Sequence, residues 1–272
     1  MKHRAPLILV RGGGDLATGV AIRLHRCGFQ VVVTEIAQPL AVRRLVALAE
    51  AIYAGQISIE GVSARRVDDV PGALRVLEKN LIPVLVDPEA TSREELNPAA
   101  LVDGRMHKLP TTFDLDSVPF VIGIGPGFHV GENCHAVVES NRGHNLGRVF
   151  WSGSAQDDTG IPEPIGNFDA DRVLRAPADG FFEGRIQLAS VVKKGDVIAR
   201  VGNVPLHAPF GGVLRGILHD GLEVERGVKV GDLDPRGILE YCFQISDKAL
   251  AVGGGVLEAL LSKAEIRSRL RP

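Results

Sequence analysis

The chain has 272 residues, and 45% of them are apolar, which is enough to bury one large core or two modest ones. Its 31 basic and 33 acidic residues give a net charge of −2, so no excess of cations is available to attract nucleic acid or an anionic membrane surface. No apolar stretch reaches the roughly 18 residues of a membrane span, and the first apolar run is too short for a signal sequence. The three cysteines lie far apart without a C-x-x-C pair, which argues against disulfides and zinc, so we expect a cytoplasmic protein without a metal site.

Strands and helices alternate through the first hundred residues. Residues 7–11 are typical of a buried strand, and residues 15–27 of a helix that ends at Gly28. Further strands are expected at 29–35, 57–67 and 82–88, and further helices at 39–55 and 70–80. This alternation predicts an α/β fold with a Rossmann-like parallel sheet covered by helices over residues 1–110.

The composition changes after this first domain. Residues 111–172 contain short β-like runs separated by glycine turns and end in a linker rich in glycine, proline and aspartate. The last segment, residues 241–272, contains three consecutive glycines at 253–255, which we expect to interrupt any long helix. A helical tail over 256–270 is then predicted to pack back on the core.

Residues 173–240 contain an internal repeat. At an offset of 32 residues, Ala176-Pro177 matches Ala208-Pro209, Gly180 matches Gly212, and Gly195 matches Gly227. The two copies resemble the halves of the barrel-sandwich hybrid fold found in biotinyl and lipoyl carrier domains, so a smaller all-β domain of that kind is expected. The hairpin that would hold the modified lysine of a carrier has no lysine here, which argues against a swinging-arm carrier.

The first strand runs directly into a G-x-G-x-x-A pattern at Gly12, Gly14 and Ala17. This pattern between a strand and a helix is typical of dinucleotide-binding turns, in which the glycines let a pyrophosphate approach the start of the helix. Glu35 lies 21 residues after Gly14, at the end of the second strand, where it would accept hydrogen bonds from ribose hydroxyls. It would repel a 2′-phosphate, which favours NAD over NADP. A turn that binds no nucleotide is the alternative.

The residues that we expect to contact the cofactor come from this turn and from a second glycine cluster, and they are Gly12, Gly13, Gly14, Asp15, Ala17, Glu35, Gly125 and Gly127. Asp15 brings negative charge close to any phosphate, and Arg11 is positioned to offset it. Gly125 and Gly127 follow a predicted strand. They form either a backbone nest for an anion or a hairpin turn.

Cys134 is the candidate nucleophile or sulfur- or selenium-handling group. Neighbours in a strand point to opposite faces, so Cys134 and the adjacent His135 are not expected to form a thiolate–imidazole pair. A small buried apolar role is the alternative for Cys134.

Three motifs extend these observations to a family: "RGGGDLATGVAIRLHRCGFQVVVTEIAQPLAVRR", "GIGPGFHVGENCHAVVESNRGHNLGRVFWSGSA" and "TGIPEPIG". With the repeat, they resemble the YqeB-type accessory proteins of selenium-dependent molybdenum hydroxylase systems. The resemblance implies a role in maturing the hydroxylase or its cofactor, with a molybdenum hydroxylase or another maturation protein as partner. It leaves the oligomeric state open.

On this resemblance, the ligand at the glycine turn is an NAD-like dinucleotide or a molybdopterin dinucleotide. The alternative function is enzymatic: an NAD-dependent oxidoreductase, or a sulfur or selenium transferase that uses Cys134.

Overall fold

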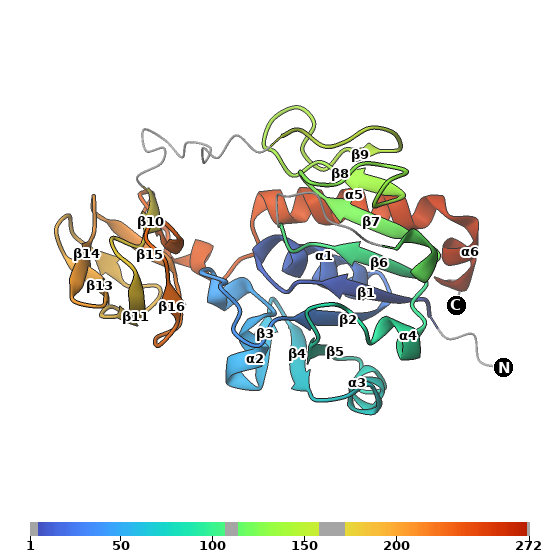
Figure 1. Ribbon diagram of the computed structural model, residues 1–272, viewed down its shortest axis with the longest axis horizontal. Helices are drawn as coiled ribbons and strands as arrows, with labels where there is room; N and C mark the ends of the chain where they lie inside the picture. Colours follow the sequence, from blue (N-terminus) through green and yellow to red (C-terminus); the bar gives the residue numbers. More distant parts are fainter. Residues whose placement is uncertain (1–4, 107–113, 158–171, 271–272) are drawn as a thin grey trace. The chain divides into compact units, whose positions relative to one another are not determined.

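The computed structural model describes residues 5–106, 114–157 and 172–270. The chain divides into two compact units (Figure 1). Unit 1 comprises residues 1–39, 48–159 and 245–272, and unit 2 comprises residues 40–47 and 160–244. Part of the predicted linker, residues 158–171, lies outside the described residues.

Unit 1 is built on a nine-stranded sheet with the strand order β3-β4-β5-β2-β1-β6-β7-β8-β9. The strands are β1 (Leu7–Arg11), β2 (Gln30–Glu35), β3 (Gln56–Ile59), β4 (Val62–Val67), β5 (Ile82–Val86), β6 (Ala100–Asp103), β7 (Val121–Ile124), β8 (Ala136–Val138) and β9 (Val149–Phe150). The strands from β4 to β8 pair in parallel, whereas β3 and β9 pair antiparallel at the two edges.

The predicted fold class, a Rossmann-like parallel sheet with a barrel-sandwich hybrid, is therefore wrong. The large sheet is mixed, and unit 2 consists of two separate antiparallel sheets. One reason lies in the connection between β3 and β4, where Glu60 and Gly61 both have positive φ, at 47° and 82°. A two-residue turn joins only antiparallel strands. The stretch that the sequence predicted as one extended segment, residues 57–67, therefore contains a hairpin.

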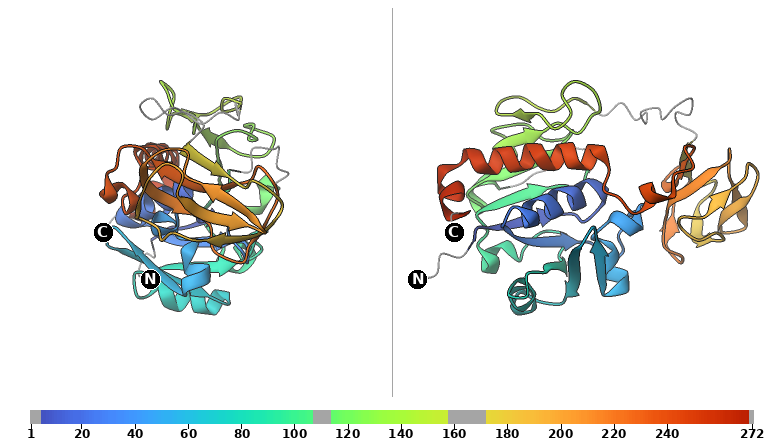
Figure 2. Two further views of the ribbon diagram at one scale, coloured as in Figure 1. Left: turned by 90° about the vertical axis from the view of Figure 1, so that its left-hand side faces the viewer. Right: turned by 180° about the vertical axis from the view of Figure 1, so that it is seen from behind.

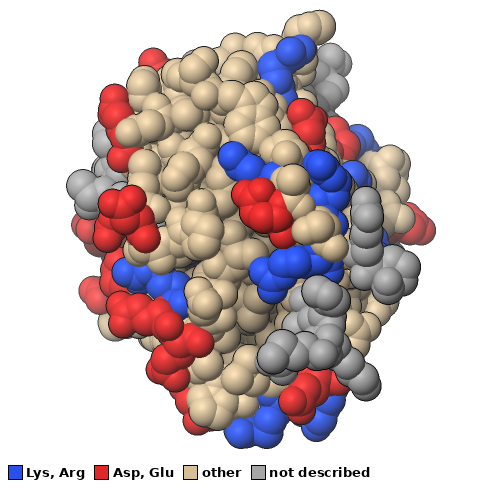
Figure 3. Space-filling model, turned by 90° about the vertical axis from the view of Figure 1, so that its right-hand side faces the viewer, with Lys and Arg blue, Asp and Glu red and all other residues tan. Residues whose placement is uncertain are grey.

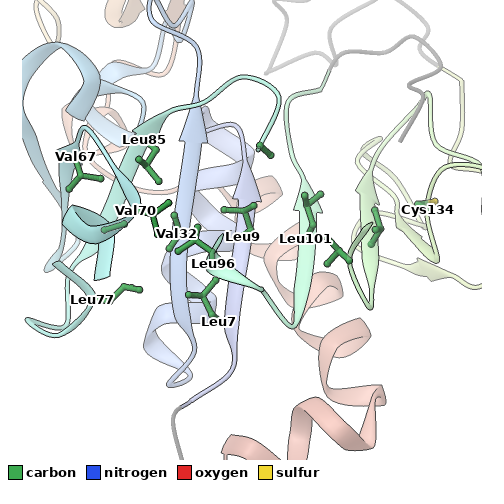
Figure 4. Close-up of a cluster of buried hydrophobic side chains, with 14 of the residues drawn as sticks. Leu7, Leu9, Val32, Val67, Val70, Leu77, Leu85, Leu96, Leu101 and Cys134 are labelled. Atoms are coloured by element: carbon green, nitrogen blue, oxygen red, sulfur yellow. The ribbon is translucent and has the colours of Figure 1, made fainter. Parts of the chain in front are cut away.

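Helices cover both faces of the sheet in unit 1. They are α1 (Asp15–Arg26), α2 (Glu50–Ala54), α3 (Val70–Leu77), α4 (Arg93–Leu96), α5 (Asp247–Ser262) and α6 (Ala264–Arg267). Figure 2 shows α1 and α5 side by side on one face. On the other face, α3 and α4 cover a buried core that includes Leu9, Val32 and Leu101 (Figure 4).

Helix α5 continues without a break through Gly253, Gly254 and Gly255, so the predicted interruption is wrong. Gly253 and Gly255 lie against neighbouring backbone on two different sides of α5. A Cβ on Gly253 would lie 3.0 Å from the carbonyl oxygen of Gly19, and a Cβ on Gly255 would overlap the carbonyl oxygen of Gly147. Tertiary packing at these close approaches outweighs the low helix propensity of glycine.

Unit 2 contains two four-stranded sheets, with the orders β10-β17-β15-β12 and β14-β13-β11-β16. The strands are β10 (Val173–Arg175), β11 (Gly180–Gly184), β12 (Val191–Val192), β13 (Val197–Val201), β14 (Val204–His207), β15 (Gly212–Ile217), β16 (Glu223–Val224) and β17 (Lys229–Asp234). Strands β11, β12 and β13 recur 32 residues later as β15, β16 and β17. The internal repeat of the sequence is thus visible as repeated strands.

The helix predicted over residues 39–55 is largely absent, because the first part of this stretch belongs to unit 2. The Ile217 amide donates to the carbonyl of Val42 (2.8 Å), and Arg44 Nε donates to the carbonyl of Ile217 (2.9 Å). Only a short 3-10 turn at Arg44–Val46 and α2 are helical here. Contacts with β15 therefore replace the local helical pattern.

The surface carries both signs of charge. On the face drawn in Figure 3, lysine and arginine side chains lie among aspartates and glutamates. Among the described residues, no helix combines the length and the apolar character needed to cross a membrane.

Candidate functional site

The candidate site lies at the carboxyl edge of the sheet in unit 1, where β1 and β6 end side by side. The strands that follow β1 are added on one side as far as β5, and β6 then returns to the other side of β1. Open α/β sheets bind ligands outside the carboxyl ends of their strands at such a reversal. The glycine turn follows β1 at this point, Asp103 is the last residue of β6, and Gly104 and Arg105 follow it.

The glycine turn is packed tightly at its first two residues and open at the third. Gly12 has a φ of 94°, and a Cβ there would lie 3.2 Å from the backbone of Arg105. A Cβ on Gly13 would lie 2.8 Å from the amide nitrogen of Ala49. A Cβ on Gly14 would have nothing within 4 Å, so the start of α1 faces free space at this residue.

Glu35 comes from the end of β2 and caps the turn. Its carboxylate accepts the Gly13 amide at Oε1 and the Ile36 amide at Oε2, both at 2.8 Å. Burial raises the pKa of Glu35, and the two amide hydrogen bonds reverse only part of that effect. The acidic residue predicted to contact a ribose therefore lies beside the glycine turn and already occupies one of its amide donors.

Arg11 and Arg105 lie at the same edge and share Asp103 as a partner, and the sequence did not predict this cluster. Arg11 is almost fully buried, and it donates from Nε to the carbonyl of Pro88 (2.8 Å) and from an amino group to Glu89 (2.7 Å). Asp103 binds Arg105 at 2.7 Å and lies 3.8 Å from Arg11. Arg11 thus pairs with Glu89 and Asp103, and its expected role of offsetting the charge of Asp15 stays a prediction. The sequence could have indicated this cluster, because Arg11 and Asp103 are charged residues at the last position of two buried strands.

The second glycine cluster ends a strand that lies two places from β1, since β6 separates β1 from β7. Two strand spacings amount to roughly 10 Å. The Gly125 amide donates to Val138 (2.9 Å), and the carbonyl of Gly127 accepts from the side-chain amide of Asn133 (3.0 Å). Because β7 and β8 are parallel, this loop is not a hairpin turn. The contribution of Gly125 and Gly127 to anion binding stays a prediction.

Cys134 lies in the core, away from the carboxyl edge. It is fully buried and belongs to the cluster of apolar side chains drawn in Figure 4. Burial raises the pKa of its thiol to about 11, so the thiol is protonated near neutral pH. His135 accepts the amide of Val121 at its Nδ1 (2.9 Å). These features favour a packing role for Cys134 over a nucleophilic one.

The described part of the structure gives no support for a metal site. Within the ranges that the structure describes, no three histidine, cysteine, aspartate or glutamate side chains gather in a way that could hold a metal ion.

No protein-family model matches the chain. The chain is 46% identical over 255 residues to the uncharacterized protein YqeB of Escherichia coli strain K12, and the match covers 94% of the chain. The chain is thus similar to this protein over most of its own length. It spans about half the length of that relative, 47%. This similarity supports the YqeB-type resemblance of the motifs, and the relative's own description assigns no activity.

Two solved structures show a weak likeness. An aspartoacylase family protein of Mesorhizobium loti is 14% identical, with a TM-score of 0.26 and coverage of 84% of the chain and 85% of that protein. A succinylglutamate desuccinylase of a Silicibacter species is 13% identical, with a TM-score of 0.25 and coverage of 84% of each chain. At these values the likeness indicates no activity for this chain.

Proposed function

We propose that the chain binds the phosphate-bearing part of a nucleotide ligand at the glycine turn of unit 1. The observation that carries the proposal is the free space at Gly14, directly at the start of α1 and next to the capped amide of Gly13. The first amides of a helix and its dipole favour an anion at this position. The turn thus combines room for a phosphate with donors that attract one.

Glu35 gives the proposed site its preference among nucleotides. Each oxygen of a carboxylate can accept more than one hydrogen bond, so Glu35 can accept from ribose hydroxyls while it keeps the Gly13 and Ile36 amides. A 2′-phosphate at the same place would be repelled by the ionised carboxylate. The proposed ligand is therefore NAD-like, or a molybdopterin dinucleotide whose pyrophosphate uses the same turn.

The cellular role belongs to the same proposal. The motifs resemble those of YqeB-type accessory proteins, and on that resemblance the proposed role is the maturation of selenium-dependent molybdenum hydroxylases, with a hydroxylase or another maturation protein as partner. The similarity to YqeB supports the resemblance itself. An NAD-dependent oxidoreductase is the enzymatic alternative. A transferase that uses Cys134 is disfavoured by the burial and raised pKa of that thiol.

Thermal unfolding with NAD⁺, NADH, NADP⁺, CTP and CDP tests the proposal. At a concentration of 100 times Kd, a ligand stabilises the folded protein by about 2.7 kcal/mol, which shifts Tm by a few degrees. Gly14→Ala should abolish the shift, because its methyl group enters the free space that the phosphate needs. Gly211→Ala is the matched control, since a Cβ there meets only ordinary contacts, the nearest at 3.5 Å.

The choice of nucleotide distinguishes an NAD-like ligand from a molybdopterin dinucleotide. A shift with NAD⁺ or NADH, but not with NADP⁺, supports an NAD-like ligand and leads next to a redox assay. A shift only with CTP or CDP supports a molybdopterin cytosine dinucleotide. Equal shifts in the wild type and in Gly14→Ala would contradict binding at the turn.

A further inference from the structure

A second candidate binding site lies between α1 and α5 in unit 1. A cavity of about 230 Å³ opens there, beside the second half of α1. Its walls combine apolar side chains, two cations and a thiol: Ile22, Leu250, Leu257, Arg23, Arg26 and Cys27. Arg23 lies eight residues after the first residue of α1, roughly 12 Å along the helix axis, so this cavity is separate from the glycine turn.

The cavity results from the way the two helices meet. A Cβ on Gly19 would lie 2.7 Å from the Cβ of Ala249, so the helices touch backbone to backbone at that point. Leu250 and Leu257, which follow Ala249 along α5, remain half-buried. With the buried Ile22, they give the cavity an apolar lining.

The two arginines of the cavity differ in their partners. Arg26 donates to the carbonyl of Glu60 at 2.6 Å and to its carboxylate at 3.2 Å. The guanidinium of Arg23 makes no hydrogen bond or ion pair with any residue in the described ranges, although the side chain is half-buried. It lies against α5, with one amino group 3.5 Å from the place that a Cβ on Gly254 would take.

An unpaired guanidinium beside apolar side chains loses hydration without gaining a counter-charge. We propose that the cavity binds a small organic anion, a carboxylate on a short apolar chain. The carboxylate would accept two parallel hydrogen bonds from Arg23, the geometry for which a guanidinium is suited. The apolar chain would lie against Ile22, Leu250 and Leu257.

Cys27 supplies a reporter of binding in the native protein. It is exposed, whereas Cys134 and Cys242 are buried, so an uncharged thiol reagent such as 4,4′-dithiodipyridine reacts first at Cys27. A ligand in the cavity shields this thiol. Saturating hexanoate should slow the reaction of Cys27 at least tenfold, and 1-hexanol at the same concentration should leave the rate unchanged.

Two variants test whether the guanidinium of Arg23 binds the carboxylate of hexanoate. Arg23→Met keeps an unbranched side chain and removes the guanidinium, so the hexanoate concentration for half-protection should rise at least tenfold. Arg75→Met is the matched control, because Arg75 lies exposed in the last turn of α3, outside the cavity, and should change nothing.

Four results would overturn the inference: no protection by hexanoate, equal protection by 1-hexanol, unchanged protection in Arg23→Met, or equal protection by acetate or inorganic phosphate. The last result would mean that charge alone is recognised, without the apolar lining. None of these results depends on Gly14, so failure here is distinguishable from failure of nucleotide binding at the turn.

Discussion

The chain contains three consecutive glycines twice, and the structure uses them in opposite ways. Residues 12–14 form the turn between β1 and α1, and residues 253–255 lie inside α5. A Cβ on Gly14 would meet nothing, whereas a Cβ on Gly253 or Gly255 would meet backbone oxygen. At Gly14 the first group leaves space for a ligand, whereas at Gly253 and Gly255 the protein itself fills the space. A run of glycines therefore indicates a site only where the neighbouring backbone stays away.

The largest expected effect is that of a methyl group at Gly255. Gly255→Ala should destabilise unit 1 by about 3 kcal/mol, because its Cβ would overlap the carbonyl of Gly147 and approach Val138 at 2.8 Å. Gly254→Ala is the matched control in the same helix. Its Cβ would meet only the Arg23 side chain, at 3.5 Å, and alanine should stabilise the helix by about 1 kcal/mol. Urea unfolding measures both, and equal stabilities would contradict the packing role of Gly255.

The glycine turn allows the same test on a smaller scale. Gly13→Ala should cost about 2 kcal/mol, because its Cβ would lie 2.8 Å from the Ala49 nitrogen. Gly14→Ala should cost less than about 1 kcal/mol, since its methyl group enters free space and only the preference for glycine over alanine at the N-cap of α1 is lost. The two variants separate packing from binding: we expect Gly13→Ala mainly to lower stability, and Gly14→Ala mainly to lower nucleotide binding. A loss of stability in Gly14→Ala as large as that in Gly13→Ala would show that the space at the turn is not free.

Replacement of Cys134 tests whether a residue of the core, unlike the glycine turn at the carboxyl edge, contributes to stability but not to nucleotide binding. Cys134→Ala removes one buried sulfur atom and should destabilise unit 1 by about 1 kcal/mol. Nucleotide-induced shifts in Tm should be the same as in the wild type, because Cys134 packs in the core. Loss of hydroxylase maturation in a folded Cys134→Ala protein that still binds nucleotide would instead support the transferase alternative.

Local patterns in the sequence predicted several elements but not how they combine. The strand before Gly12 and the helix after it were recognisable, because apolar periodicity and a glycine turn are local signals. The continuity of α5 through Gly253 was not, since it depends on the backbone of Gly19, more than two hundred residues away in the chain. The pairing of Arg11 with Glu89 has the same origin, because it depends on how β5 and β1 are placed in the sheet.

The smallest expected effect is the pH dependence that Glu35 contributes. Its pKa in the folded protein is raised, mainly by burial, so the folded state binds this proton more tightly than the unfolded state does. The stabilisation is then fully present below the ordinary glutamate pKa of about 4.3 and is lost as the pH rises through the raised value. Glu35→Gln removes this titration. Urea unfolding of both proteins between pH 4 and pH 7 should show the wild type losing stability relative to Glu35→Gln as the pH rises. A difference that is constant over this range would mean that the amides of Gly13 and Ile36 fully compensate the burial of the carboxylate, and the capped turn would then be an even better-prepared acceptor for a ribose.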